Sequence, residues 1–106
     1  MITVTIHRSN NSYAGFKVVG HAGYAEEGYD IICAAVSVLV VNAVNSIETF
    51  TDDKFAARED HGIVELILES SVSDKTTLLL DSMILGLRDI QTQYGNEFIR
   101  LKIEEV

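Results

Sequence analysis

The sequence of 106 residues has no proline, no tryptophan and a single cysteine, Cys33. One cysteine cannot form a disulfide within the chain, which excludes a disulfide-stabilised secreted scaffold and indicates a reducing compartment, the cytoplasm. Basic residues are also scarce, since eight Lys and Arg stand against sixteen Asp and Glu, and none lies from Val18 to Asp53. Because nucleic-acid binding requires clustered cations, we expect no direct contact with nucleic acid.

Apolar runs are shorter than a membrane span requires. The longest, Ile31 to Val44, has 14 residues, whereas a span needs about 18 or more. No basic segment precedes an apolar one near Met1, so we expect no signal peptide. With 47% hydrophobic residues, the chain is expected to form one globular domain over residues 1–106, in the cytoplasm and away from membranes. Its net charge of −8 favours a basic protein partner.

Hydrophobic periodicity predicts seven elements in the order ββαββαβ. The predicted strands cover residues 2–6, 13–19, 55–58, 63–69 and 98–103. The first two form a hairpin across residues 9–12, and the next two form a second hairpin across residues 59–62. Strand pairs separated by single helices predict an α+β two-layer domain, a mixed sheet with both helices packed on one face.

Two long segments predict the helices. Residues 31–49 contain many valines but no Gly or Pro, and a run of this length is too long for a strand. Asp30 is the expected N-cap of this first helix. Because nearly every face is apolar, we expect the helix to be covered by the sheet and by a second subunit. The second helix is expected from a cap at Ser73 to about Tyr94, ended by Gly95.

Chemistry is expected where a glycine-containing loop, Gly20 to Tyr29, meets the start of the first helix. With Asp30 as the cap, Cys33 occupies the third helical position, where unpaired amides and the helix dipole favour a thiolate. His21, at the start of the loop, is the candidate base, since a Cys–His pair supplies a nucleophile and a general acid. Ser37 lies one turn after the cysteine and can orient the histidine or bind substrate.

Other interpretations remain open. A lone cysteine in an alanine-rich helix is more often a small buried hydrophobe, in which case the chain is a non-catalytic dimeric module that binds a basic protein. A redox thiol would lack a resolving cysteine. The spacings of His7, His21, His61 and Cys33 match no zinc motif, so we expect neither a metal nor a cofactor. The acidic pairs at residues 26–27 and 52–53 point apart and are interpreted as solvated surface.

The segment from Gly20 to Ser37 resembles a known signature. Gly-His-Ala, a glycine-bearing loop and then Gly-x-Asp-Ile-Ile-Cys-Ala-Ala-Val-Ser are similar to the motif of the ribosomal-processing cysteine proteases, the Prp family. The order of the flanking elements agrees over nearly the whole chain. The resemblance implies a cytoplasmic endopeptidase that works as a homodimer. Its implied reaction is removal of a short apolar N-terminal extension from the precursor of ribosomal large-subunit protein twenty-seven. For the alternative, a non-catalytic dimeric module, the resemblance implies a basic ribosomal protein as the partner.

The resemblance also implies roles for individual residues. Cys33 is the implied nucleophile and His21 the implied base. Three further residues fall on supporting positions of the family: Gly20, Asp30 and Ser37. Two loop tyrosines, Tyr24 and Tyr29, are expected to cover the apolar extension, and packing of the loop itself explains them equally well.

Overall fold

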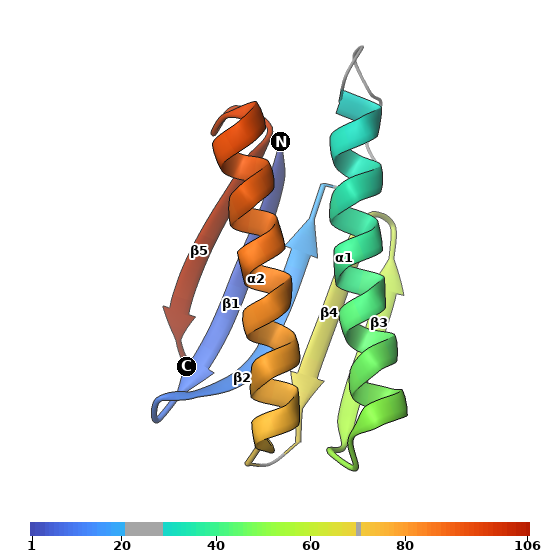
Figure 1. Cartoon of the computed structure of the whole chain (residues 1–106), viewed down its shortest axis with the longest axis vertical. Helices are drawn as coiled ribbons and strands as arrows, with labels where there is room; N and C mark the ends of the chain where they lie inside the picture. Colours follow the sequence, from blue (N-terminus) through green and yellow to red (C-terminus); the bar gives the residue numbers. More distant parts are fainter. Residues whose placement is uncertain (21–28, 70) are drawn as a thin grey trace.

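The structure is a computed structural model that describes residues 1–20, 29–69 and 71–106. Its elements follow in the order ββαββαβ (Figure 1), which confirms the predicted order and the α+β class. The elements are β1 Ile2–Ser9, β2 Ser12–Val19, α1 Tyr29–Phe50, β3 Phe55–Asp60, β4 Ile63–Leu68, α2 Asp74–Tyr94 and β5 Ile99–Glu105.

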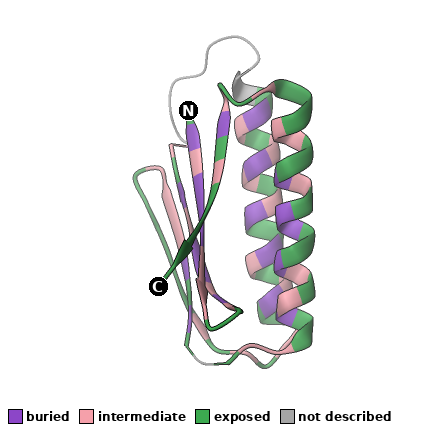
Figure 2. Ribbon diagram, turned by 90° about the vertical axis from the view of Figure 1, so that its left-hand side faces the viewer, coloured by how far each residue is buried: buried purple, intermediate pink, exposed green. Residues whose placement is uncertain are grey.

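The five strands form one mixed sheet in the order β3-β4-β2-β1-β5. Neighbouring strands are antiparallel except β1 and β5, which are parallel. Both helices lie on the same face of this sheet (Figure 2), so the predicted two-layer arrangement is confirmed. The chain therefore has a helical face and an open face of the sheet.

Both hairpins close through two residues with positive φ. Asn10 and Asn11 have φ of 53° and 63°, and His61 and Gly62 have φ of 43° and 81°. This backbone suits the twist of a two-residue hairpin, and Asn and Gly adopt it most readily. The predicted four-residue turn over residues 59–62 was therefore wrong, because β3 continues to Asp60. Glu59 consequently lies on a strand.

The core fills the space between the sheet and the two helices. Strand alternation sets it up: Val4 pairs with Val18 on one side and with Leu101 on the other, so apolar residues form rows on the helical face. The sheet buries Ile2, Val4, Ile6, Phe16, Val18, Leu66, Leu68 and Ile99, and the helices bury Ile32, Val36, Val40, Ala43, Ile47, Leu80, Met83, Ile84 and Leu87.

The ends of α2 are as predicted. The Ser73 side chain accepts a hydrogen bond from the Thr76 amide, as an N-cap does, and Gly95 ends the helix with φ of 96°. The start of α1 differs from the prediction, because the helix already includes Tyr29. Asp30 is therefore not the N-cap and lies inside the first turn.

The outer face of α1 is apolar and exposed. Ile31 and Val38 are 66% and 68% exposed, and Val41 and Phe50 are exposed as well. By length and composition, Ile31–Phe50 even satisfies the criterion for a membrane span, with a mean hydropathy of 1.9 and 28% of the span buried. The apolar run of 14 residues counted in the sequence is thus shorter than the apolar stretch of this helix. Core helices of globular proteins pass the same criterion, and α1 packs its inner face on the sheet.

Candidate active site

The candidate site lies at the end of the molecule where β2 finishes and α1 starts (Figure 1). Gly20 follows β2 directly, and its amide donates a hydrogen bond to the Gly62 carbonyl in the turn between β3 and β4, at 3.1 Å. Its φ is 96°, and a Cβ at this position would lie 2.5 Å from the Met1 carbonyl oxygen. Only glycine fits here, so Gly20 fixes where the chain leaves the sheet.

Cys33 lies near the start of α1. It is partly buried and packs against the hydrophobic core. Because α1 begins at Tyr29, Cys33 is the fifth helical residue and not the third, as the sequence predicted. The Cα–Cβ bond in a helix tilts toward the N-terminus, which brings the side chain back toward the first turn. The positive end of the helix dipole therefore still acts on this position.

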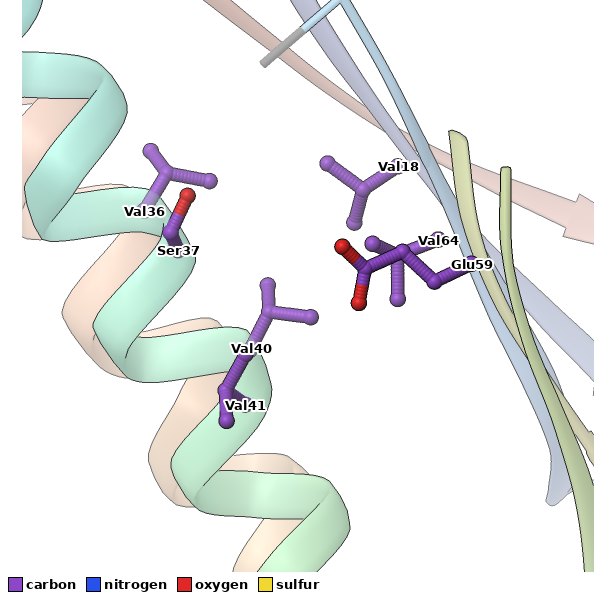
Figure 3. Close-up of a pocket in the computed structure, with 7 residues that line it drawn as sticks. All are labelled: Val18, Val36, Ser37, Val40, Val41, Glu59 and Val64. Atoms are coloured by element: carbon purple, nitrogen blue, oxygen red, sulfur yellow. The ribbon is translucent and has the colours of Figure 1, made fainter. Parts of the chain in front are cut away.

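Ser37 stands one turn after Cys33 and is half-buried. Residues four apart share a helix face, so the two side chains follow one ridge of α1. Ser37 also lines an apolar pocket between α1 and the sheet, with a volume of about 100 Å³ (Figure 3). The other lining residues are Val36, Val40 and Val41 of α1, Val18 of β2, Val64 of β4 and Glu59 of β3.

Glu59 was missed as a site residue by the sequence analysis. In Figure 3 its carboxylate points from β3 across the gap toward α1. Glu59 was predicted to lie in a turn, whereas it pairs with Val64 inside the ladder. Phe55, Ala57 and Glu59 alternate along β3 and so share the face toward the helices. That alternation is the signal that would have identified it.

Several predicted site residues are not placed by the structure. His21 and Tyr24 lie outside the described residues, as do Glu26 and Glu27. Tyr29 and Asp30 contribute to the first turn of α1, and nothing further is described for them. The structure thus places Gly20 and Cys33 at the same end of the molecule, with Ser37 one turn further along α1.

Within the acidic pair at residues 52–53, Asp52 is exposed, as predicted for solvated surface, whereas the prediction was wrong for Asp53, which is half-buried and hydrogen-bonded. Asp53 Oδ2 accepts hydrogen bonds from the Ser73 amide at 2.9 Å and from the Ser73 hydroxyl at 2.7 Å. Hydrogen bonds from the Thr76 side chain and the Ser73 amide hold the pKa of Asp53 below its usual value. This carboxylate ties the segment after α1 to the start of α2.

The described ranges contain no group of three or more His, Cys, Asp or Glu arranged to hold a metal. His7 lies in β1, within the sheet. His61 lies in the turn between β3 and β4 and contacts Asp60 at 3.3 Å. Of these two histidines, one therefore belongs to a strand and the other to a turn, and neither is part of a metal-binding group within the described ranges.

Comparison with known proteins gives a consistent result. The family model for cysteine protease Prp matches residues 1–99. The ribosomal processing cysteine protease Prp of Bacillus subtilis is 33% identical over 101 residues, covering 89% of this chain and 90% of the relative. The structure of an essential ribosomal processing protease Prp from Staphylococcus aureus with a substrate peptide has a TM-score of 0.89 at 30% identity, covering 98% of this chain and 100% of that one. A structure of the Staphylococcus aureus protease with a covalently linked product peptide has a TM-score of 0.85 at 31% identity, with the same coverage.

Proposed function

The chain belongs to the cysteine protease Prp family, and we propose that it removes a short N-terminal extension from the precursor of ribosomal large-subunit protein twenty-seven, in the cytoplasm, during ribosome maturation. Membership of the family makes the chain a cysteine-type peptidase, a hydrolase. The observation that carries the proposal is the position of Cys33, the sole cysteine, near the start of α1 and one turn from an apolar pocket. An apolar extension requires an apolar surface close to the nucleophile.

The proposed chemistry is a Cys–His dyad. His21 accepts the proton of the Cys33 thiol, and the thiolate attacks the carbonyl carbon of the scissile peptide bond. The tetrahedral intermediate collapses as the imidazolium of His21 donates that proton to the leaving amine, which frees the mature protein. The extension stays on Cys33 as a thioester. Water, deprotonated by His21, then hydrolyses the thioester, releases the extension as a carboxylic acid and restores the thiol.

The chain geometry supports a role for His21. This residue follows Gly20, whose position at the end of β2 is fixed by its contacts with Met1 and Gly62. The first turn of α1 lies at the same end of the molecule (Figure 1). Gly20, which precedes His21 in the sequence, and the start of the helix that carries Cys33 thus share one end of the molecule.

The supporting residues have simpler proposed roles. Asp30 and Ser37 orient the dyad or the substrate, since each lies within about one turn of Cys33 along α1. Tyr24 and Tyr29 cover the bound extension. The peptide amides at the start of α1 are suited to stabilise the oxyanion of the tetrahedral intermediate.

We further propose that the chain works as a homodimer through the outer face of its helices. The outer stripe, defined here as Ile31, Ala34, Val38 and Val41, is exposed on α1. Beside it, an open groove of about 560 Å³ runs between α1 and α2. Exposed apolar surface of this kind favours an interface. A second copy offers the same apolar stripe, as a two-fold interface requires.

A cleavage assay tests the function. The substrate is a synthetic peptide that spans the extension and the first residues of the mature ribosomal protein. We expect the native protein to cut it at a single bond, and Cys33→Ala to bind it while cutting at least ~10⁴-fold more slowly, as removal of a nucleophile does. His21→Ala should be slowed by a similar factor.

Ser82→Ala is the matched control, since Ser82 is an exposed serine on α2. It should cut at the native rate. Cleavage that survives Cys33→Ala would refute the assigned nucleophile. Tight binding without any cleavage by the native protein would refute the protease and favour a non-catalytic module.

A further inference from the structure

The pocket beside Ser37 has a fully buried floor and an open rim. Three valines form the floor, and their exposed fractions are between 0% and 2%: Val18, Val36 and Val40. Val64 adds a half-buried wall from β4. The rim carries Val41 and Glu59, which are exposed. The floor and the wall together consist of Val18, Val36, Val40 and Val64, and we call the space that they enclose the valine pocket.

The valine pocket lies directly along the helix from the nucleophile. Cys33, Ser37 and Val41 follow each other at intervals of four residues, so they form one ridge of α1 beside the pocket. One helical turn rises about 5.4 Å, and an extended peptide advances about 3.3 Å per residue. A peptide whose scissile carbonyl lies at Cys33 therefore reaches the pocket, one turn along α1, within about two residues.

The size and lining of the pocket fit one aliphatic side chain. Its volume is about 100 Å³, and an apolar cavity of about 150 Å³ is large enough to hold a benzene molecule. Apolar walls take up an apolar group and leave a polar one without hydrogen bonds. The pocket therefore discriminates by removing an aliphatic side chain from water.

Glu59 adds a charge at the mouth of this pocket. Its strand neighbours have partners on the open side, since Arg58 contacts Glu65 at 3.3 Å and Asp60 contacts His61. Within the described residues, no Lys, Arg or His forms an ion pair with Glu59. The carboxylate points toward α1 over the valines (Figure 3). A bound peptide with a cation beside its aliphatic residue would therefore meet an opposite charge.

We propose that the valine pocket is a specificity site that takes one aliphatic side chain of the precursor's N-terminal extension, and that Glu59 pairs with a basic residue next to it. The inference rests on the proposed function, because it assumes that the extension lies along α1 at Cys33. It assigns a recognition role to residues on three strands and one helix that the dyad does not use.

The test measures binding, so that it does not depend on cleavage. The probe is a fluorescent peptide that consists of the extension alone, and its Kd for the native protein is measured by anisotropy. Replacing its aliphatic residues by alanine one at a time should reveal one position at which Kd rises about 10- to 100-fold, as expected for loss of one buried aliphatic side chain.

Val64→Phe should fill the pocket. The Kd of the parent peptide for Val64→Phe should then equal the Kd of the alanine-substituted peptide for the native protein. For Val64→Phe itself, the alanine substitution in the peptide should leave Kd unchanged. Ile67→Phe is the control, since Ile67 is on the same strand but on the open face of the sheet. Ile67→Phe should keep the native Kd, and its Kd should respond to the alanine substitutions in the peptide as that of the native protein does. A folded Val64→Phe with the native pattern would overturn the proposal, as would a native protein that shows no sensitive position.

Glu59→Gln tests the charge without risk to folding, because Glu59 is exposed. We expect it to weaken binding of a peptide with the basic residue about two- to fivefold at low salt, as for a surface ion pair. A peptide with a neutral residue at that position should be unaffected. Glu69→Gln, at the far end of β4, is the control. Equal effects of Glu59→Gln on both peptides would overturn the role of Glu59. Binding that follows these rules without cleavage of the full precursor peptide would instead refute the protease mechanism alone.

Discussion

Cys33 has the partial exposure that a nucleophile requires. It packs against the core, which fixes its direction, and it retains some exposure, which lets a substrate approach. A fully buried thiol is inert, and a fully exposed one reacts with little selectivity. The Cys33 thiol therefore lies at the edge of the hydrophobic core and is not enclosed by it.

Tyr13 gives a prediction at the scale of a single residue. Its hydroxyl donates a hydrogen bond to the Asp81 carboxylate on α2, and the Arg8 guanidinium lies 4.6 Å from the centre of its ring. Burial, and then the bond to Asp81, raise the pKa of Tyr13 to about 12. An unfolded tyrosine titrates near 10. The folded state therefore holds this proton more tightly, so the stabilisation is complete below pH 10 and is lost between pH 10 and 12.

We expect the free energy of unfolding of the native protein to fall between pH 9.5 and 11.5 more steeply than that of Tyr13→Phe. Urea unfolding at the two pH values measures the difference. Tyr94→Phe is the control, because Tyr94 is exposed at the end of α2, and it should keep the native slope. Equal slopes for the native protein and Tyr13→Phe would contradict the assignment.

At the scale of elements, the junction between α1 and α2 depends on one capping serine. Ser73 accepts a hydrogen bond from the Thr76 amide at 3.3 Å and donates one to Asp53 at 2.7 Å. Its side chain therefore both caps α2 and holds the segment that leads from α1 to β3. Loss of the hydroxyl leaves the Thr76 amide without its cap.

Ser73→Ala should lower the free energy of unfolding by about 1 kcal/mol, the usual value for an N-cap serine. Urea unfolding at neutral pH measures it. Ser82→Ala, on the exposed face of the same helix, should change stability by less than about 0.5 kcal/mol. If the two variants were equally stable, the capping role would be wrong.

The elements show what the sequence could predict. Ser73, Gly95 and the strand alternation are local signals, and they placed α2 and most strands correctly. The start of α1 was misplaced by assigning Asp30 as the N-cap. The exact length of a turn decided the face of Glu59, and composition alone allowed either two or four residues in that turn. The strand order depends on contacts distant in sequence, which no local pattern encodes.

The same contrast holds for the site. Cys33 could be found because it is the sole cysteine and stands at the start of a long apolar helix. Its pairing with His21 was inferred from the place of the histidine at the start of the glycine-containing loop, and the resemblance to a family implied the same pair. The pairing stays a prediction, since His21 lies outside the described residues. The valine pocket could not be predicted, because its members come from α1, β2 and β4 and meet only after folding.

At the scale of the whole molecule, the two faces differ in character. The open face of β1 carries Thr3, Thr5 and His7, and Thr5 pairs with Lys17 of β2. The helical face instead exposes the outer stripe of α1. Among the described residues, most of the exposed large apolar side chains lie on the two helices, whereas Val19 and Ile67 are exposed on the open face of the sheet. The helical layer is consequently the side that a second copy would cover.

Val38→Glu should convert the proposed dimer into a monomer, because it places a charge at a strongly exposed position of the outer stripe. Analytical ultracentrifugation of the native protein and the variant measures this. Val106→Glu is the control, since Val106 has a similar exposed fraction, 67% against 68%, but lies at the chain end. A native monomer, or a Val38→Glu dimer as stable as the native one, would contradict the proposed interface.

The central claim is that Cys33 is an activated nucleophile in a site that binds the precursor's extension. A peptide of the extension with a C-terminal chloromethyl ketone tests it most directly, because a thiolate displaces the chloride and forms a stable carbon–sulfur bond. We expect intact-mass and peptide analysis to find one label per chain, on Cys33, formed much faster than with a scrambled peptide and slowed in His21→Ala. A label on another residue, or equal rates for the extension and the scrambled peptide, would contradict the claim.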